Sequence, residues 1–176
     1  MATIRQKIVT AARWGIAHEP RIHYGEIRPV PLGRTLPLTT DCSGFVTLCY
    51  FLAGAPDPNG LDYSGEGWTG TLLGHLDEIE RASARRGDLV VWGAYPGRHV
   101  AIVLEPGDDP LLCSHGQERG PLAVRFSDED RWQACSSTCL DGLRAASASD
   151  EERAGVRREL DRRAGGRADG LAGGDG

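Results

Sequence analysis

Long hydrophobic runs are the first feature that this sequence lacks. No stretch approaches the roughly 18 apolar residues that a membrane-spanning helix requires. The opening segment, MATIRQKIVTAARWGIAHEP, also lacks the uninterrupted apolar core of a signal peptide. The sequence therefore predicts a protein that is made in a cytoplasm without membrane insertion, and that needs another component if it acts elsewhere.

The sequence also lacks an excess of positive charge and an even set of cysteines. It carries 20 basic and 25 acidic side chains, which gives a net charge of -5, whereas nucleic-acid binding needs a clustered basic surface. Its five cysteines are unevenly spaced and fit a secreted disulfide framework poorly. We therefore expect no nucleic-acid partner and at least one free thiol.

What the sequence does contain is a pattern typical of one folded domain with an extension. The composition predicts a domain over residues 1–143 and a flexible, charged, Gly-Ala-rich tail over residues 144–176. Apolar residues at helical spacing predict an amphipathic helix over residues 4–20 and a second helix that begins near residue 42 and stops at Gly54. A short third helix is expected over residues 71–79.

Turn-forming residues separate the other predicted elements. Prolines and a glycine make residues 23–37 an ordered surface loop that leads to the second helix. After the third helix, β-rich runs alternate with Gly and Pro turns, which predicts an antiparallel meander. The predicted strands cover residues 88–92, 99–104, 111–115 and 122–126.

A cysteine stands at the start of the second predicted helix, in the stretch DCSGF. A helix N-terminus carries partial positive charge and free N–H donors, which favour a thiolate and can receive an oxyanion. Cys42 is therefore a candidate nucleophile, with a small buried hydrophobe as the alternative interpretation. Asp41 or Thr40 can cap the first turn. Cys49 lies on the apolar stripe, so we assign it to the core.

A base for this thiol can be sought on the predicted strands. If the strands over residues 99–104 and 111–115 pair around Gly107, His99 stands opposite His115, with Cβ atoms roughly 5 Å apart. A slip of one residue would place Ser114 opposite His99 instead. The neighbouring side chain would hold the tautomer and orientation of His99 as the base.

Zinc binding is an alternative for one of these histidines. Thiolate and imidazole groups are the donors that zinc prefers, and the C-x-H and C-x₃-C spacings are not a strong zinc signature. We expect no metal and no organic cofactor. Zinc would remove His115 from a catalytic role; the four candidate ligands are Cys113, His115, Cys135 and Cys139.

Four short segments in this order resemble the NlpC-type family of papain-like cell-wall peptidases. They are DCSGF at 41–45, RGDLVVW at 86–92, HVAIV at 99–103 and SHG at 114–116. The resemblance covers roughly residues 4–130 and implies an α+β, papain-like fold in which the nucleophile helix packs on a small antiparallel sheet. The surrounding sequence, including GFVTLCYFLAGAPDPNGLDYSG and WTGTLL, is similar to that of endolysins of actinobacterial phages.

The resemblance implies a thiol-dependent endopeptidase that hydrolyses peptidoglycan stem peptides at the D-glutamyl–diamino acid bond. Cys42 would attack the carbonyl carbon, His99 would accept and then donate the proton, and His115 would orient His99. Tyr24 is the candidate that would complete the oxyanion hole with the backbone N–H of Cys42. A phage lytic protein of this kind would reach the cell wall with the help of a holin or as part of a virion.

Four further residues are candidates for substrate binding. Asp41 and Ser43 match family positions that contact polar groups of the substrate. Trp68, in a glycine-rich loop, is a candidate for the cleft wall, and Arg98 is a candidate for attracting a substrate carboxylate. Two alternatives to the endopeptidase remain: an N-acetylmuramoyl-alanine amidase or other papain-like acyl transfer, and a non-catalytic wall-binding or virion structural protein.

Overall fold

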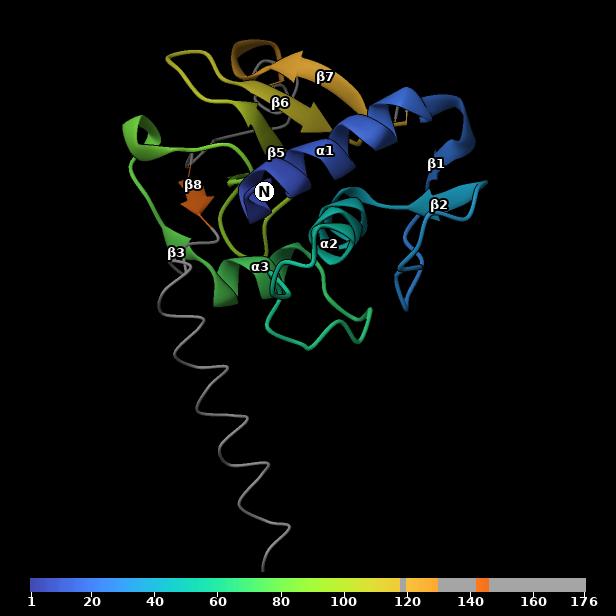
Figure 1. The fold of residues 1–176 in the computed structure, drawn as a ribbon. Coiled ribbons are helices and arrows are strands. Elements are labelled where there is room, and N and C mark those ends of the chain that lie inside the picture. The colour runs from blue at the N-terminus through green and yellow to red at the C-terminus, as the bar shows by residue number, and fades with distance from the viewer. Residues whose placement is uncertain (118–119, 130–141, 146–176) are drawn as a thin grey trace, which may run out of the picture. The chain divides into compact units, whose positions relative to one another are not determined.

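Helices and two β-sheets make up the computed structural model, which describes residues 1–117, 120–129 and 142–145 (Figure 1). The helices are α1 (Ile4–Ala17), α2 (Cys42–Ala53) and α3 (Thr69–His75), with 3₁₀ turns at Glu19–Arg21 and Arg81–Ser83. The strands are β1 (Ile22–Tyr24), β2 (Leu38–Thr40), β3 (Asp77–Glu78), β4 (Leu89–Trp92), β5 (His99–Glu105), β6 (Leu111–Ser114), β7 (Leu122–Arg125) and β8 (Gly142–Ala145).

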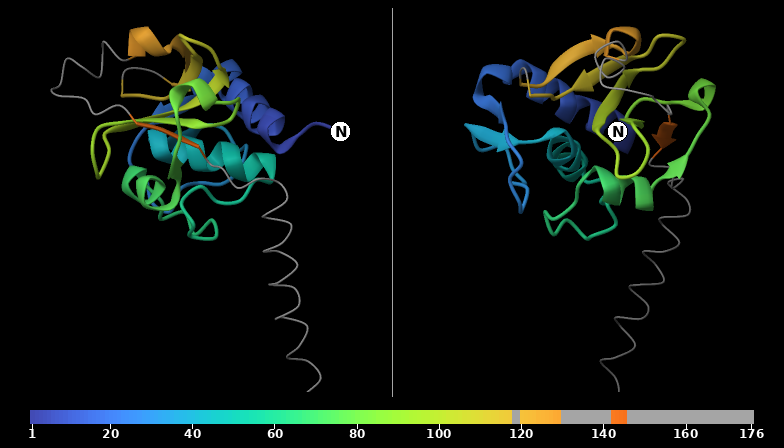
Figure 2. Two further views of the ribbon diagram at one scale, coloured as in Figure 1. Left: turned by 90° about the vertical axis from the view of Figure 1, so that its left-hand side faces the viewer. Right: turned by 180° about the vertical axis from the view of Figure 1, so that it is seen from behind.

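The larger sheet has the strand order β3-β8-β4-β5-β6-β7, and its neighbouring strands are antiparallel. Helices α1 and α2 lie side by side and pack against β5, as Figures 1 and 2 show from different directions. The buried core between helices and sheet includes Ile8, Ala12, Phe45, Leu48, Val100 and Ile102. This arrangement confirms the predicted α+β class, with α2, the helix that begins at Cys42, packed on an antiparallel sheet.

A second apolar cluster involves alternate residues of the same strands. It contains Val90, Trp92, Ala101, Val103, Leu112 and Phe126. Successive side chains of a strand point to opposite faces, so the two clusters cover opposite sides of β4 and β5. Both faces of these central strands are therefore buried.

The predicted helices form, with shifted ends. Thr3 caps α1, which ends at Ala17 and is followed by a 3₁₀ turn that contains Pro20. Helix α2 begins at Cys42 and stops at Gly54, whose φ of 66° lies in the left-handed region that favours glycine. Helix α3 begins two residues before the predicted start because the Thr71 hydroxyl accepts a hydrogen bond from the backbone N–H of Trp68 at 2.8 Å and closes its first turn.

The predicted register of the β5–β6 hairpin is wrong by one residue. Ala101 pairs with Ser114 and Val103 pairs with Leu112, while the register shifts between Val103 and Glu105. This bulge adds one residue to β5 and moves every later pair along the strand. Because side chains alternate, Ser114 rather than His115 lies on the same side of the sheet as Ala101 and the His99 two residues before it.

A small parallel sheet sets the path of the chain into α2. Tyr24 of β1 pairs with Thr40 of β2, two residues before Cys42. The loop predicted over residues 23–37 therefore starts later than expected, because His23 and Tyr24 belong to β1. This pairing brings Tyr24 beside the start of α2 despite the 16 residues between Tyr24 and Asp41 in the sequence.

The predicted boundary between residues 1–143 and the tail 144–176 crosses β8. This strand pairs with β3 and β4 and reaches Ala145. Residues 146–176, which carry nearly all of the predicted tail, lie outside the described residues, as do Cys135 and Cys139.

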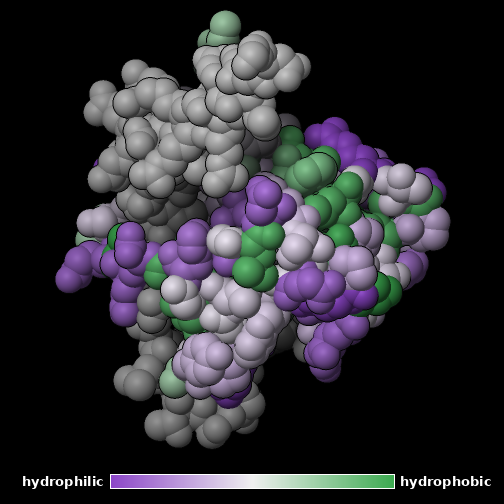
Figure 3. Space-filling model, turned by 90° about the horizontal axis from the view of Figure 1, so that it is seen from below, coloured by the Kyte–Doolittle hydropathy of each residue, from purple (hydrophilic) through white to green (hydrophobic). Residues whose placement is uncertain are grey.

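The helices of the described residues are too short or too polar to cross a membrane. Figure 3 shows one face of the molecule, on which hydrophobic residues form small groups separated by hydrophilic ones. The apolar surface on the described part of this face is thus divided into small patches.

Candidate active site

Cys42 is the first residue of α2 and is 6% exposed. Asp41 is the N-cap: its Oδ1 accepts hydrogen bonds from the backbone N–H of Gly44 at 2.6 Å and from the Ser43 hydroxyl at 3.0 Å. A residue in the first turn has no carbonyl one turn earlier in the helix to receive its amide proton. The backbone N–H of Cys42 is therefore placed where an anion at the helix start would be stabilised.

Asp41 contributes to stability through this cap. We expect Asp41→Ala to lower the free energy of unfolding by about 1–2 kcal/mol, because the first turn of α2 loses its side-chain acceptor. Asp41→Asn keeps an acceptor oxygen and should retain most of this stability. Chemical denaturation of both variants checks the prediction, and equal losses from the two substitutions would contradict it.

His99 begins β5 and is 6% exposed. Burial alone would lower its pKa, but side-chain hydrogen bonds with Cys42 and Glu129, together with the negative charge of both groups, raise the pKa from 6.5 to about 9. The structure thus brings the predicted nucleophile and the predicted base into contact. A thiol in contact with an imidazole is an arrangement that can perform nucleophilic catalysis.

The other side of the His99 ring meets two oxygen atoms. Nε2 of His99 lies 2.8 Å from Oγ of Ser114 and 3.2 Å from Oε1 of Glu129. The Ser114 hydroxyl donates its hydrogen to Glu129 at 3.1 Å, so its oxygen is left to accept a hydrogen from Nε2. The proton therefore resides on Nε2, and Nδ1 is the ring atom available to Cys42.

His115 occupies a different place from the one that the sequence predicts. Its Nε2 donates to the carbonyl oxygen of Thr40 at 2.8 Å, and its ring centroid lies 5.5 Å from those of Tyr24 and Phe45. The shifted register turns its side chain toward α2 rather than along the face that carries His99. The orienting role predicted for His115 is therefore corrected: Ser114 and Glu129 make the contacts at Nε2 of His99.

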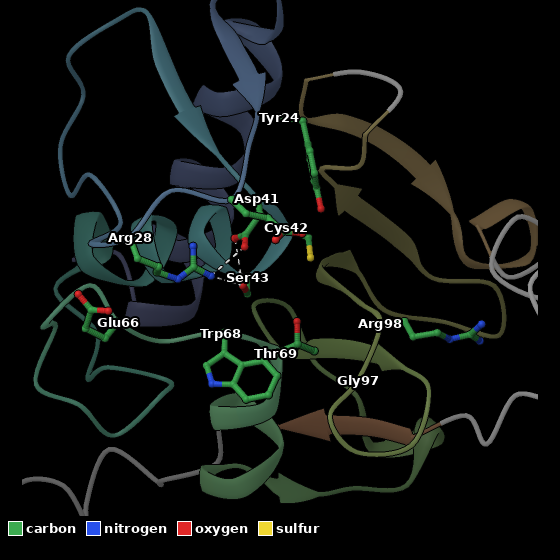
Figure 4. Close-up of a pocket in the computed structure, with 11 residues that line it drawn as sticks. Tyr24, Arg28, Asp41, Cys42, Ser43, Glu66, Trp68, Thr69, Gly97 and Arg98 are labelled. Carbon is green, nitrogen blue, oxygen red and sulfur yellow. Dashed lines mark hydrogen bonds and ion pairs between the residues drawn. The ribbon is translucent and has the colours of Figure 1, made fainter.

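A cavity of about 410 Å³ opens at Cys42 (Figure 4). Figure 4 shows the side chains of Tyr24 and Thr69 reaching toward Cys42 from different elements, whereas the guanidinium of Arg98 points away from it. All five predicted binding or oxyanion residues lie in the wall of this cavity. The lining residues are Tyr24, Glu26, Arg28, Asp41, Cys42, Ser43, Glu66, Trp68, Thr69, Gly97 and Arg98.

Solved structures share this arrangement of helices and sheet. The NlpC/p60 domain of the peptidoglycan hydrolase SagA is similar with a TM-score of 0.51 and 21% identity over 79% of this chain and 97% of that chain. The fold is that of NlpC/P60 domains. A Staphylococcus aureus protein described as similar to lipoprotein, of the NLP/P60 family, gives a TM-score of 0.53 and 20% identity over 82% of this chain, but only 42% of that longer chain.

Sequence comparison adds no closer relative. No protein-family model and no curated protein matches this chain. The structural likeness to NlpC/P60 domains confirms the predicted fold. The finer prediction of an actinobacterial phage endolysin stays a prediction.

Two residues that contact the predicted site residues in this NlpC/P60 fold were missed in the sequence. Arg28 donates from Nη2 to Oδ2 of Asp41 at 2.8 Å and to Oγ of Ser43 at 3.1 Å, so it forms an ion pair beside Cys42. Glu129 reaches His99 from a helical turn at residues 126–129. Neither residue belongs to a local motif, whereas Ser114 appeared in the alternative register of the hairpin.

The zinc alternative finds no support in the part of the chain that the structure describes. No group of three or more His, Cys, Asp or Glu residues there could hold a metal ion. The thiol of Cys113 lies 3.8 Å from the carbonyl oxygen of Ala12, and burial raises its pKa well above the usual range. Two of the four candidate ligands, Cys135 and Cys139, lie outside the described residues.

Proposed function

We propose that this chain is a cysteine peptidase that hydrolyses peptide bonds of peptidoglycan stem peptides. The observation that carries the proposal is the contact between Cys42, at the start of α2, and His99, at the start of β5, at a cavity of about 410 Å³. A cavity of this size can take several residues of a peptide. The peptidoglycan substrate is supported by the likeness to the NlpC/p60 domain of SagA.

Cys42 and His99 would divide the reaction between them. The Cys42 thiolate forms a bond to the carbonyl carbon, and the protonated His99 gives its proton to the leaving amine as the peptide bond breaks. His99 then takes a proton from water, the resulting hydroxide attacks the thioester, and the Cys42 thiolate is released. These steps need no metal or organic cofactor.

Tyr24 is the proposed side-chain donor to the oxyanion. The pairing of β1 with β2 places it beside Thr40, and its side chain lines the cavity with Cys42. The backbone N–H of Cys42 supplies the second donor. Two donors that are fixed before the substrate arrives stabilise the negative charge that develops on the carbonyl oxygen.

Removal of the Tyr24 hydroxyl tests this role. We expect Tyr24→Phe to lower kcat by about 10²-fold with little change in KM, because the hydroxyl acts mainly in the transition state. Tyr63→Phe is the control, since the Tyr63 hydroxyl donates to the carbonyl oxygen of Ala55 at 2.7 Å and does not line the cavity. Equal losses in the two variants would argue against an oxyanion role.

The cavity wall suggests how the substrate is held. Asp41 and Ser43 are tied to Arg28, so these three residues present a hydrogen-bonding group beside Cys42. Trp68 offers an aromatic surface that is 41% exposed, and Arg98 also lines the cavity, with its guanidinium pointing away from Cys42. We assign these residues to substrate binding. We propose that the bond hydrolysed is the one between D-glutamate and the diamino acid.

The biological setting is proposed from the resemblance of the wider sequence to phage endolysins. We infer a phage endolysin or lytic protein that acts at the cell wall, is delivered by a holin or a virion, and has a peptidase domain over about residues 1–143 with a tail after it. Expression with and without a holin tests this delivery: wall lysis from inside the cell should require the holin.

The products of wall digestion test the function. Purified peptidoglycan is incubated with the wild-type chain and with Cys42→Ala, and the released fragments are identified by mass spectrometry. The proposal predicts new amino groups on the diamino acid with the wild-type chain only. Free lactyl groups on muramic acid would instead identify an amidase, and absence of hydrolysis by a folded wild-type chain would favour a structural protein.

A further inference from the structure

We propose that Glu129 is a positioning residue for His99, and that with Ser114 it holds a proton on Nε2 and favours the charged form of the ring. This inference rests on the proposed role of His99 as the base. Glu129 follows β7 in the chain, so it belongs neither to β6, the strand after β5, nor to any motif identified in the sequence. It would act through the ring, without touching the substrate.

The three polar groups form a closed triangle. Oγ of Ser114 lies 2.8 Å from Nε2 of His99 and 3.1 Å from Oε1 of Glu129, and the remaining side, between Nε2 and Oε1, is 3.2 Å long. Because the Ser114 hydroxyl donates to Glu129, the hydrogen between Oγ of Ser114 and Nε2 comes from the His99 ring. The side chains of His99 and Glu129 are each 8% exposed, so water screens this charge pair weakly.

The turn that carries Glu129 also fixes the plane of the His99 ring. Phe126, at the start of this turn, stacks on Trp92 with ring centroids 5.8 Å apart, and Trp92 lies 5.4 Å from the His99 ring. Glu129 follows Phe126 by three residues, about one helical turn. One short segment therefore supports the face of the ring through Trp92 and the edge of the ring through its carboxylate.

Hydrogen bonds anchor this turn to the loop between β5 and β6. The backbone N–H of Phe126 donates to the carbonyl oxygen of Pro110 at 3.0 Å. Ser127 donates from its backbone N–H and its hydroxyl to Asp109, at 2.9 and 3.0 Å, and these bonds lower the pKa of Asp109. The segment that carries Glu129 is thus tied at its start to residues 109–110.

Two charged groups from two elements act on His99. Cys42 approaches from α2 and Glu129 from the turn after β7, while the adjoining side chains of Trp92 on β4 and Ser114 on β6 are uncharged. Both charges raise the pKa of His99. Loss of the Glu129 charge should therefore lower the pH at which the ring loses its proton.

The test is a titration of the His99 imidazole by NMR in the full chain. Glu129→Gln keeps the shape but removes the charge, and we expect the pKa of His99 to fall by about 1–3 pH units. Glu129→Asp keeps the charge and should retain much of the wild-type value. Glu105→Gln is the matched control, because Glu105 lies at the other end of β5 in an ion pair with Arg13 and should leave His99 unchanged.

The outcomes separate this inference from the proposed function. A lower pKa in Glu129→Gln, with the fold intact by circular dichroism, supports the positioning role even if no wall hydrolysis is found. An unchanged pKa in a folded Glu129→Gln variant overturns it, even if the wild-type chain hydrolyses walls. If Glu129→Gln does not fold, the titration in Glu129→Asp decides, since a fall there as large as 1–3 pH units would show that charge is not what raises the pKa.

Discussion

Replacement of Cys42 with alanine is expected to reduce wall hydrolysis at least about a thousandfold while the fold is retained. In the proposed mechanism, the substitution removes the sulfur that forms the covalent intermediate. The side chain is small, so its loss from the cavity wall should change stability by only about 1 kcal/mol. Release of peptide fragments from purified walls measures the effect.

Cys49→Ala is the matched control for this substitution. Cys49 lies in the same helix, seven residues after Cys42, and is 1% exposed in the core. Its replacement should lower stability by a similar amount and leave hydrolysis close to that of the wild-type chain. Loss of hydrolysis in Cys49→Ala but not in Cys42→Ala would show that the wrong thiol has been assigned.

Replacement of His99 is expected to have the second largest effect. His99→Ala should lower hydrolysis by about 10²–10⁴-fold, because the thiolate loses its charge partner and the leaving amine loses its proton donor. His75→Ala is the control, since His75 is exposed at the end of α3. A similar loss in both variants would indicate that histidine replacement acts through the fold.

The raised pKa of His99 fixes the direction of the pH dependence. Protonated His99 is the acid in the proposed mechanism, so hydrolysis should fall as the pH rises through about 9. His99 binds its proton more tightly in the folded chain, because its pKa there is about 9 whereas the pKa of an unfolded histidine is 6.5. Its contribution to stability is therefore complete below about pH 6.5 and disappears as the pH rises through about 9.

The sequence carries most of the information about the fold. The spacing of apolar residues predicts α1 and α2, and Asp41 and Gly54 mark the two ends of α2 as the structure has them. Short β-rich runs between Gly and Pro turns predict the central strands. These signals are local, since each depends on neighbours within one helical turn or one strand.

Contacts between segments that are distant in the chain could not be predicted from the sequence. A bulge near Val103 shifts the β5–β6 register by one residue, and this shift exchanges the faces of Ser114 and His115. Hairpin pairing can be predicted from the length of the turn. A bulge adds one residue to one of the two strands, and no distinct residue type marks its position in the sequence. The prediction therefore found the right strand for the partner of His99 and assigned the wrong residue on it.

Arg28 and Glu129 show the same limit at longer range. Arg28 reaches Asp41 because β1 and β2 pair, and Glu129 reaches His99 because the turn after β7 folds back over Trp92. Charged residues in loops are common, and their burial is decided only when the surrounding elements pack. Tertiary packing, rather than a motif, selects these two side chains.

Limited alkylation with iodoacetamide, mapped by peptide mass spectrometry, tests the central claim that the Cys42 thiol performs the chemistry. Burial raises the pKa of the Cys49 and Cys113 thiols, so neither should react readily, while Cys42 opens onto the cavity. We predict that loss of wall hydrolysis follows the modified fraction of Cys42 one for one. Full hydrolysis by a chain whose Cys42 is completely alkylated would contradict the account.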